Sequence, residues 1–206
     1  MDEQVRPVAC LGDSRMQVRS FPAQVRRSIG SALYDAQKGE KAPAAKPFKG
    51  VGSGVFEIAL RWNRDVQAGC RSDKATLQAS REDGGTGMTL KKDPEYEIGS
   101  GNVFANLGLD DADELLTRAQ LGHAVRLILK AKKLKQREIA ALLGIDQAEV
   151  SKLMNGQYHL FAEKRLFTFL KALEQKVTIH VSRRRKGDPY QEVTLATDAV
   201  RSPQRT

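Results

Sequence analysis

The chain has 206 residues, 29% of them charged and 40% hydrophobic, with a formal net charge of +9 at pH 7 and a pI near 9.7. This length suits one or two domains, and the excess of basic residues favours an acidic partner such as nucleic acid. Because no apolar run approaches the ~20 residues that cross a bilayer, we expect no membrane span.

A helix and a strand are predicted in the first third of the chain. Residues 20–38, bounded by Pro22 and Gly39, place one apolar stripe on a helix: Val25, Ile29, Ala32, Leu33 and Ala36. After a loop rich in Pro, Ala and Lys, residues 54–62 alternate, with Phe56, Ile58, Leu60 and Trp62 on one apolar face of a strand. The glycines at 50, 52 and 54 precede that strand instead of opening a helix, so we interpret them as a turn and not as a phosphate-binding loop.

The runs GDSRMQVRSFPAQVRRSIGSALYDAQKGE and KPFKGVGSGVFEIALR, within residues 5–62, resemble the start of RelE-like toxins of the HigB type. That resemblance implies an RNA-cleaving growth inhibitor whose usual partner is a HigA-type antitoxin. In the family further strands complete the sheet, whereas residues 63–87 are polar and lack strand periodicity. We therefore interpret residues 1–62 as a truncated toxin-like segment without RNA-cleaving activity. One helix and one strand bury too little apolar surface, so we expect loose packing unless a partner supplies the missing strands.

Residues 63–110 are predicted to be a linker and an antitoxin N-terminal arm, largely irregular. Two explanations of the break after Trp62 stay open. A frameshift in a toxin gene could have read through to an antitoxin that originally began at Met88, or the segment could be an ordinary disordered linker between two evolved domains. The frameshift hypothesis requires that an alternative frame over codons 62–88 encode an apolar, alternating strand with a basic aromatic end.

Four helices are predicted in the second half of the chain. The first, 114–131, follows an acidic turn (Asp110, Asp111, Asp113) and has one apolar stripe: Leu121, Ala124, Val125, Ile128 and Leu129. Residues 136–155 predict two helices that meet at Gly144, where the turn requires a positive φ, with Ala140 at their closest approach. Their inward positions are Ile139, Leu143, Ile145, Val150 and Leu153. The fourth helix, 162–175, buries Leu166, Phe169, Leu170 and Leu173.

The second helix of the 136–155 pair has the features of a helix that enters a DNA groove. Asp146 is expected to cap it, and Glu149, three residues later, to complete a capping-box-like pair. The remaining positions are short, polar and directed outward: Gln147, Ala148, Ser151, Lys152 and Asn155.

The run LKQREIAALLGIDQAEVSKLMNG resembles the helix-turn-helix of Cro and phage-repressor (XRE) proteins, and the resemblance covers residues 114–175. It implies binding to double-stranded DNA, with Gln136 on a phosphate and Gln147 on a base, commonly adenine. We predict that Ser151 and Ala148 also read bases and that Lys152 and Asn155 hold the backbone. Asp146 stands where relatives commonly carry Ser or Thr, which puts a hydroxyl-to-phosphate contact at this cap in question.

Basic residues gather around the same motif: Arg126, Lys130, Lys132, Lys133, Lys135, Arg137 and Lys152. A basic face attracts phosphate without regard to sequence, while a recognition helix supplies the choice of site. We predict phosphate contacts from Lys132, Lys133, Lys135 and Arg137. The run Arg183–Lys186 is equally compatible with phosphate contact and with a solvated surface.

Cysteine, histidine and the N-terminus argue against a metal centre and against export. Cys10 and Cys70 lack metal-ligand spacing, and the three histidines (His123, His159, His180) are scattered, so we interpret the histidines as surface or half-buried residues. The first residues have no basic segment followed by an apolar core. We expect a cytoplasmic protein without a metal or another cofactor.

Residues 177–182 alternate apolar and polar side chains and predict a strand after the fourth helix. Pairing with the same strand of a second subunit would give a homodimer with recognition helices ~34 Å apart, suited to a palindromic operator. The alternative is pairing with residues 191–195 in the same chain. Residues 196–206 are expected to be a disordered tail.

These features predict a mainly α protein. A four- to five-helix Cro/repressor-like domain with a short C-terminal strand would occupy 111–195, behind an incomplete α+β toxin-like segment. The expected function is that of an antitoxin-type autorepressor of a toxin-antitoxin operon, not of an enzyme, with a RelE/HigB-like toxin as a further candidate partner. One alternative is an RNA-cleaving RelE/HigB-type toxin held inactive by its fused antitoxin, and another is a module whose helix-turn-helix binds protein.

Overall fold

The computed structural model describes residues 6–47, 55–58, 96–179 and 183. The chain divides into two compact units, Met1–Leu109 and Asp110–Thr206. Several sequence-based predictions lie outside the described residues: the glycine turn at 50–54, the strand beyond residue 58, the break at 63–95 with Cys70 and Met88, the position of His180, the basic residues 184–186, the strand partner at 191–195, and the tail.

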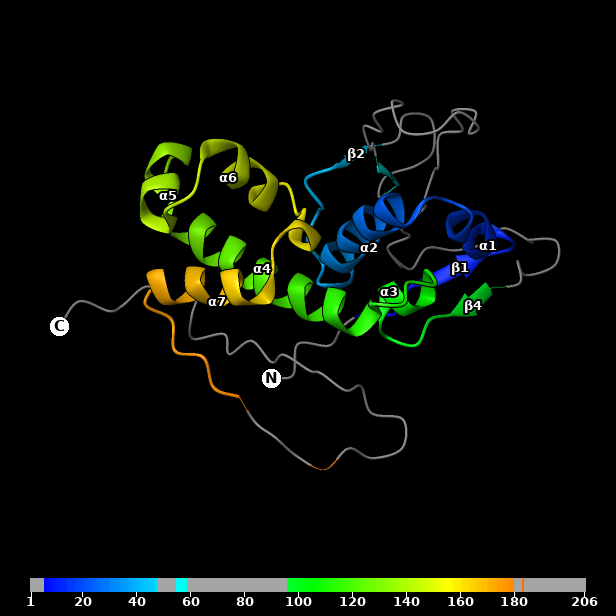
Figure 1. Ribbon diagram of the computed structural model, residues 1–206. Coiled ribbons are helices and arrows are strands. Elements are labelled where there is room, and N and C mark those ends of the chain that lie inside the picture. Colours follow the sequence, from blue (N-terminus) through cyan, green and yellow to red (C-terminus); the bar gives the residue numbers. More distant parts are fainter. Residues whose placement is uncertain (1–5, 48–54, 59–95, 180–182, 184–206) are drawn as a thin grey trace, which may run out of the picture. The chain divides into compact units, whose positions relative to one another are not determined.

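The described residues of the N-terminal unit form three helices and two short antiparallel strand pairs (Figure 1). In chain order the elements are β1 (Ala9–Leu11), α1 (Ser14–Arg19), α2 (Ala23–Gln37), β2 (Ala45–Pro47), β3 (Phe56–Ile58), β4 (Tyr96–Ile98) and α3 (Val103–Asn106). β1 pairs with β4, with Ala9 opposite Ile98, and β2 pairs with β3, with Ala45 opposite Ile58.

Helix α2 begins and ends close to where the sequence predicts. Pro22 is its N-cap, and Gly39 has a φ of +76° just beyond its end. The buried face differs from the predicted stripe, however. Ile29 and Ala32 are buried as expected, but Tyr34 and Asp35 are also buried, whereas Val25, Leu33 and Ala36 are only half-buried. The extra helix α1 before Pro22 was not predicted.

The predicted loop before the strand is partly wrong, because β2 forms within it. β2 pairs with β3, the part of the predicted 54–62 strand that the structure describes. The expected single apolar face is not found there, since Phe56, Glu57 and Ile58 are all half-buried. The ammonium of Lys41 lies 5.2 Å from the centroid of the Phe56 ring.

The prediction of a largely irregular 63–110 segment is wrong for residues 96–109. β4 pairs with β1, and α3 packs on α2. Phe104 of α3 is fully buried, and Gly30 of α2 makes room for it, because a Cβ there would lie 2.5 Å from the Phe104 ring. α3 thus supplies apolar surface to the N-terminal unit, which was expected to be loosely packed unless a partner supplied the missing strands.

The side chains of three arginines donate hydrogen bonds to main-chain oxygens at the end of α3. The Nε atoms of Arg15 and Arg19 donate to the main-chain oxygen of Asn106 at 3.2 and 3.1 Å. Arg26 donates from Nη1 to the carbonyl oxygens of Leu107 and Gly108, at 2.8 and 2.6 Å. These donors satisfy carbonyls that a helix C-terminus leaves without intrahelical partners. Residues 96–109 are therefore tied to the N-terminal unit by polar as well as apolar contacts.

The C-terminal unit contains the helices that the sequence predicts. They are α4 (Ala112–Lys132), α5 (Gln136–Leu143), α6 (Gln147–Met154), the 3-10 helix η1 (Tyr158–Leu160) and α7 (Glu163–Ala172). α4 packs along α7 and against η1, and α5 packs on α6. All five residues of the predicted stripe on α4 are buried, as are Leu166, Phe169, Leu170 and Leu173. The fold class is thus mainly helical, as predicted.

A strand is not formed at 177–179, the described part of the predicted 177–182 strand. Val177 and Ile179 are 43% and 75% exposed there. A strand is stable only when its backbone groups find a neighbouring strand. Among the helices that the structure describes, none is long and apolar enough to cross a membrane.

Candidate nucleic-acid interface

The turn between α5 and α6 has the geometry that Gly144 predicts. Gly144 has a φ of +65° and ends α5, and its N–H donates to the carbonyl oxygen of Ala140. Ile139, Leu143, Val150 and Leu153 are buried as expected, and Ile145 is half-buried. The two helices are therefore held together by an apolar seam on one side.

A side-chain hydrogen bond is formed at the start of each helix of the pair. The Asp146 carboxylate accepts the N–H of Glu149 at 2.6 Å, which confirms the predicted cap of α6. The predicted return contact from Glu149 is wrong, because its carboxylate binds Arg165 of α7 instead. At the start of α5 the Glu138 carboxylate accepts the N–H of Lys135 at 2.6 Å.

One face of α6 is left open by this packing. Gln147, Ala148, Lys152 and Asn155 are exposed, and Ser151 is half-buried. The Asn155 amide donates to the Ser151 hydroxyl at 3.3 Å, so these two polar groups form a linked pair. Successive residues of a helix are about 100° apart, so the five residues share one arc that faces away from the buried Val150 and Leu153. The structure thus brings together every residue predicted to touch DNA on α6.

The predicted phosphate-contacting residues flank that face in the chain. Lys132 and Lys133 end α4, Lys135 precedes α5, and Gln136 and Arg137 open it. All five side chains are exposed. Exposed cations beside a polar helix face suit contact with a phosphate backbone.

Arg126 is an exception among the basic residues, because it is fully buried within the C-terminal unit. Its Nη2 lies 3.3 Å from Nδ1 of His123, and its guanidinium lies 5.9 Å from the centroid of the Tyr158 ring. A guanidinium can only donate, so Nδ1 accepts. The inclusion of Arg126 in the basic face was wrong, and so was the interpretation of His123 as a surface or half-buried residue, since it is also buried.

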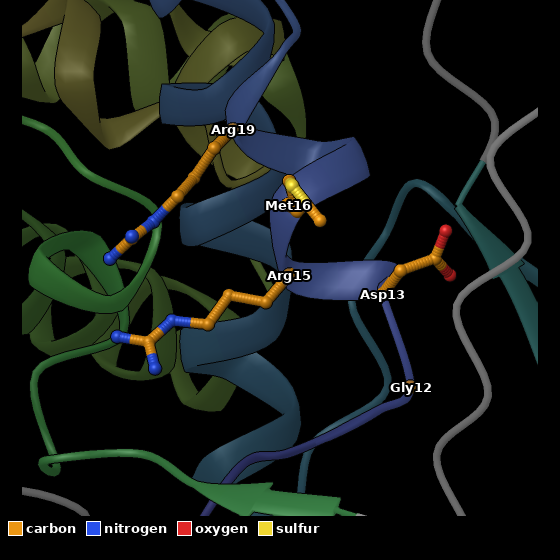
Figure 2. Close-up of a pocket in the computed structure, with 5 residues that line it drawn as sticks. All are labelled: Gly12, Asp13, Arg15, Met16 and Arg19. Carbon is orange, nitrogen blue, oxygen red and sulfur yellow. The ribbon is translucent and has the colours of Figure 1, made fainter.

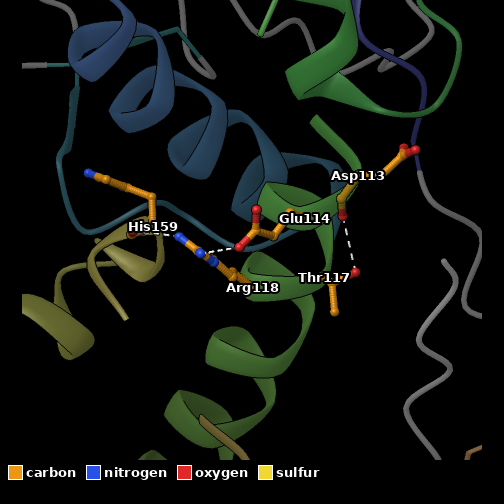
Figure 3. A network of polar contacts seen from close by, with 5 residues as sticks. All are labelled: Asp113, Glu114, Thr117, Arg118 and His159. Carbon is orange, nitrogen blue, oxygen red and sulfur yellow. Dashed lines mark hydrogen bonds and ion pairs between the residues drawn. The ribbon is translucent and has the colours of Figure 1, made fainter. Parts of the chain in front are cut away.

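A polar network joins α4 to the segment that follows α6 (Figure 3). Arg118 pairs with Glu114 one turn earlier and donates from Nη1 to the carbonyl oxygen of His159 at 3.4 Å. Next to it on the same helix, the Thr117 hydroxyl donates to the carbonyl oxygen of Asp113 at 3.1 Å. η1 is consequently held on α4 by its backbone as well as by the buried Tyr158 ring.

Comparisons with known proteins match this half of the chain. Residues 103–182 match a helix-turn-helix domain family. A solved structure titled "Putative XRE Family Transcriptional Regulator" is 32% identical, covers 42% of this chain and 98% of its own, and has a TM-score of 0.38. Residues 103–182 therefore contain a helix-turn-helix domain. No curated relative matches it at a significant level.

The family match begins at residue 103, inside the N-terminal unit, so it includes α3 as well as the helices of the C-terminal unit. The sequence placed the start of the XRE-like domain at 111 and treated the preceding residues as an arm. No apolar periodicity could have revealed α3, because it has only four residues. The Asn102 cap was a possible signal, since its side chain accepts the N–H groups of Phe104 and Ala105.

A pocket of about 350 Å³ lies outside the XRE-type helices, at α1 (Figure 2). Gly12, Asp13, Arg15, Met16 and Arg19 line it. Figure 2 shows both arginines extending from α1 in the same direction, and both donate to the Asn106 carbonyl oxygen. These two side chains therefore serve the packing of α3. Within the described part of the chain, no group of three or more His, Cys, Asp or Glu residues could hold a metal ion.

Replacing Lys133 by Gly is expected to stabilise the C-terminal unit and to weaken DNA binding. Lys133 ends α4 with a φ of +52°, a left-handed conformation that costs an L-residue about 1–2 kcal/mol. The greater unfolded-state freedom of Gly offsets about 0.4–1 kcal/mol, so the net gain in unfolding free energy lies between about 0 and 1.6 kcal/mol. Loss of one phosphate contact should make the plot of log binding constant against log salt concentration less steep by about 0.9. Thermal unfolding and salt-dependent DNA titration measure the two effects.

Glu174→Gly is the matched control for Lys133→Gly. Glu174 has a φ of +59° just after α7 and is also exposed. It should give a similar gain in stability without weakening DNA binding. If Lys133→Gly and the unmodified chain have equal DNA affinity and equal salt dependence, Lys133 does not contact a phosphate.

Proposed function

We propose that this chain binds an operator in double-stranded DNA through α6 and represses transcription of its own operon. The observation that carries the proposal is the arc of exposed polar side chains on α6, together with the exposed cations at the end of α4 and the start of α5. Gln147 can bond an adenine edge, the Ala148 methyl can contact a thymine methyl, and Ser151 can bond either strand. Gln136, Lys152 and Asn155 hold the phosphate backbone, together with Lys132, Lys133, Lys135 and Arg137.

A homodimer on a palindromic operator is part of the proposal. The exposed Val177 and Ile179 lie after α7 in a segment without secondary structure that could pair with the same segment of a second copy. Two recognition helices in one dimer would lie about one turn of DNA apart, ~34 Å. Equal affinity for a single half-site and for the complete palindrome would contradict the dimer.

The antitoxin role draws support from residues 96–109. This segment directly precedes α4 and pairs with β1 and α2 of the segment that resembles a HigB-type toxin. Phe104 is buried in this unit, and the main-chain oxygens at the end of α3 accept hydrogen bonds from Arg19 and Arg26. An antitoxin arm bound to its toxin remnant in the same chain would have this arrangement. The function we propose is that of a regulator, without an enzymatic step.

The test is a gel-shift titration against the DNA upstream of the chain's own coding sequence. Gln147→Ala combined with Lys152→Ala should abolish the specific shift, because it removes a base contact worth about 1–3 kcal/mol and a phosphate contact. Residual binding should be equal on operator and on unrelated DNA.

The matched control removes the same two side-chain types elsewhere. Gln24 on α2 and Lys171 on α7 are both exposed, and Gln24→Ala with Lys171→Ala should leave the specific shift intact. Unchanged binding by the Gln147 and Lys152 variant would contradict the assignment of α6 as the recognition helix. Absence of any shift by the unmodified chain would contradict DNA binding and leave the alternative that the helix-turn-helix binds protein.

A further inference from the structure

Glu149 is the one acidic residue within α6, the helix that the proposed function places against DNA. At about 100° per residue, it stands roughly 60° from Lys152 around the helix, at the edge of the exposed arc. Its side chain is 25% exposed, so solvent reaches it only in part. A partly desolvated carboxylate at the rim of a DNA-reading face would repel phosphates and weaken binding.

Arg165 of α7 neutralises this carboxylate in a fixed geometry. Its Nη1 and Nη2 atoms donate to Oε1 and Oε2 of Glu149 at 2.6 and 2.7 Å. Such two-point pairing fixes orientation as well as charge, and Lys cannot reproduce it.

The guanidinium of Arg165 also lies near two buried aromatic rings. It lies 5.9 Å from the ring centroid of Phe161 and 5.8 Å from that of Phe169. These rings are in edge-to-face contact with each other, with centroids 5.9 Å apart and an interplanar angle of 70°. Because both rings belong to the core, the position of Arg165 is set by the packing of the unit and does not depend on Glu149 alone.

We propose that Arg165 is a positioning residue for operator recognition, which holds the Glu149 carboxylate in a neutral pair so that α6 can approach the phosphates. The proposal rests on the proposed function, because it presumes that α6 meets DNA. Arg165 itself touches no base in this scheme. The favourable effect on binding comes from removing a repulsion, and it follows that Arg165 is dispensable once Glu149 carries no charge.

A double-variant cycle on the full chain tests this consequence with operator titrations at two salt concentrations. Arg165→Met keeps the apolar contact with the rings, frees the carboxylate, and should weaken operator binding about tenfold at low salt, with a smaller loss at high salt. Glu149→Gln combined with Arg165→Met should restore the affinity to within about threefold of the unmodified chain. A purely structural role would not give this rescue or the salt dependence. Failure of the double variant to recover would overturn the proposal, because Arg165 would then act on DNA or on the fold directly.

Lys171→Met is the matched control, since it removes one positive charge from an exposed site on the same helix. It should change affinity less than threefold. A tenfold loss for this variant as well would show that overall charge, not the Glu149 pair, sets the affinity, and would overturn the proposal. Absence of binding by the unmodified chain contradicts the proposed function, whereas normal binding by Arg165→Met contradicts only the role of Arg165.

Discussion

Phe104→Ala should unfold the N-terminal unit at a markedly lower temperature while leaving the helix-turn-helix unit folded. Phe104 is fully buried between α3 and α2, and Val103 and Leu107 beside it are nearly so. Truncation of a buried Phe to Ala costs about 3–5 kcal/mol, because transfer free energy is lost and a cavity remains. A unit with three-residue strands and with α2 as its one long described helix buries little apolar surface, so it has little stability to lose.

The measurement is calorimetry or circular dichroism of the full chain, where a transition assigned to the N-terminal unit should shift and a second should stay in place. Ile98→Ala is the control in the same segment, because Ile98 is 66% exposed and its loss should change stability by less than about 0.5 kcal/mol. An equal effect of the two variants would show that residues 96–109 do not belong to the core of the N-terminal unit.

The helix-turn-helix half could be predicted because its signals are local. Gly144 marks a left-handed backbone position, Asp146 supplies a cap three residues before the N–H that it accepts, and α4 is long enough for its stripe to recur several times. Each of these requirements is met within a few residues of the side chain concerned. The same locality explains why the exposed arc on α6 agrees with the predicted DNA-contacting residues in position.

The N-terminal unit could not be predicted in this way. β1, β2, β3 and β4 have three residues each, and α3 has four, which is too short for any periodic pattern. What stabilises them is pairing across long separations, such as β1 with β4 and the Arg15 and Arg19 contacts to the Asn106 carbonyl. A single sequence does not show which distant segments meet, so residues 96–109 were read as an arm.

Two charged residues show the same limit inside the predicted half. The sequence predicts Arg126 to be part of a basic surface, but the residue is buried against His123 and Tyr158. The sequence predicts Glu149 to be a capping residue, but its carboxylate binds Arg165, which is 16 positions later. His123 is one turn before Arg126 on α4, but Tyr158 and Arg165 come from other helices, so spacing along one helix could not identify these two partners.

Gly122→Ala should destabilise the helix-turn-helix unit, although Ala usually favours a helix. In a helix interior the change from Gly to Ala is worth about 1 kcal/mol in the stabilising direction. Here a Cβ would lie 2.4 Å from Cδ1 and 2.7 Å from Cγ of Tyr158, whose side chain is fully buried on η1. The atoms in conflict belong to the root of a packed ring and cannot turn aside, so overpacking of about 1–3 kcal/mol or more exceeds the propensity gain.

The destabilisation should be relieved by making room for the new methyl group. Tyr158→Leu removes the ring atoms in conflict, so the double variant should recover part of the stability that Gly122→Ala loses, even though Tyr158→Leu alone is destabilising. Chemical denaturation of the four proteins measures the coupling. Additive losses in the double variant would show that Gly122 does not limit the approach of η1 to α4. Since η1 follows α6 directly, a confirmed coupling would also predict weaker operator binding by Gly122→Ala under conditions in which the unit is still folded.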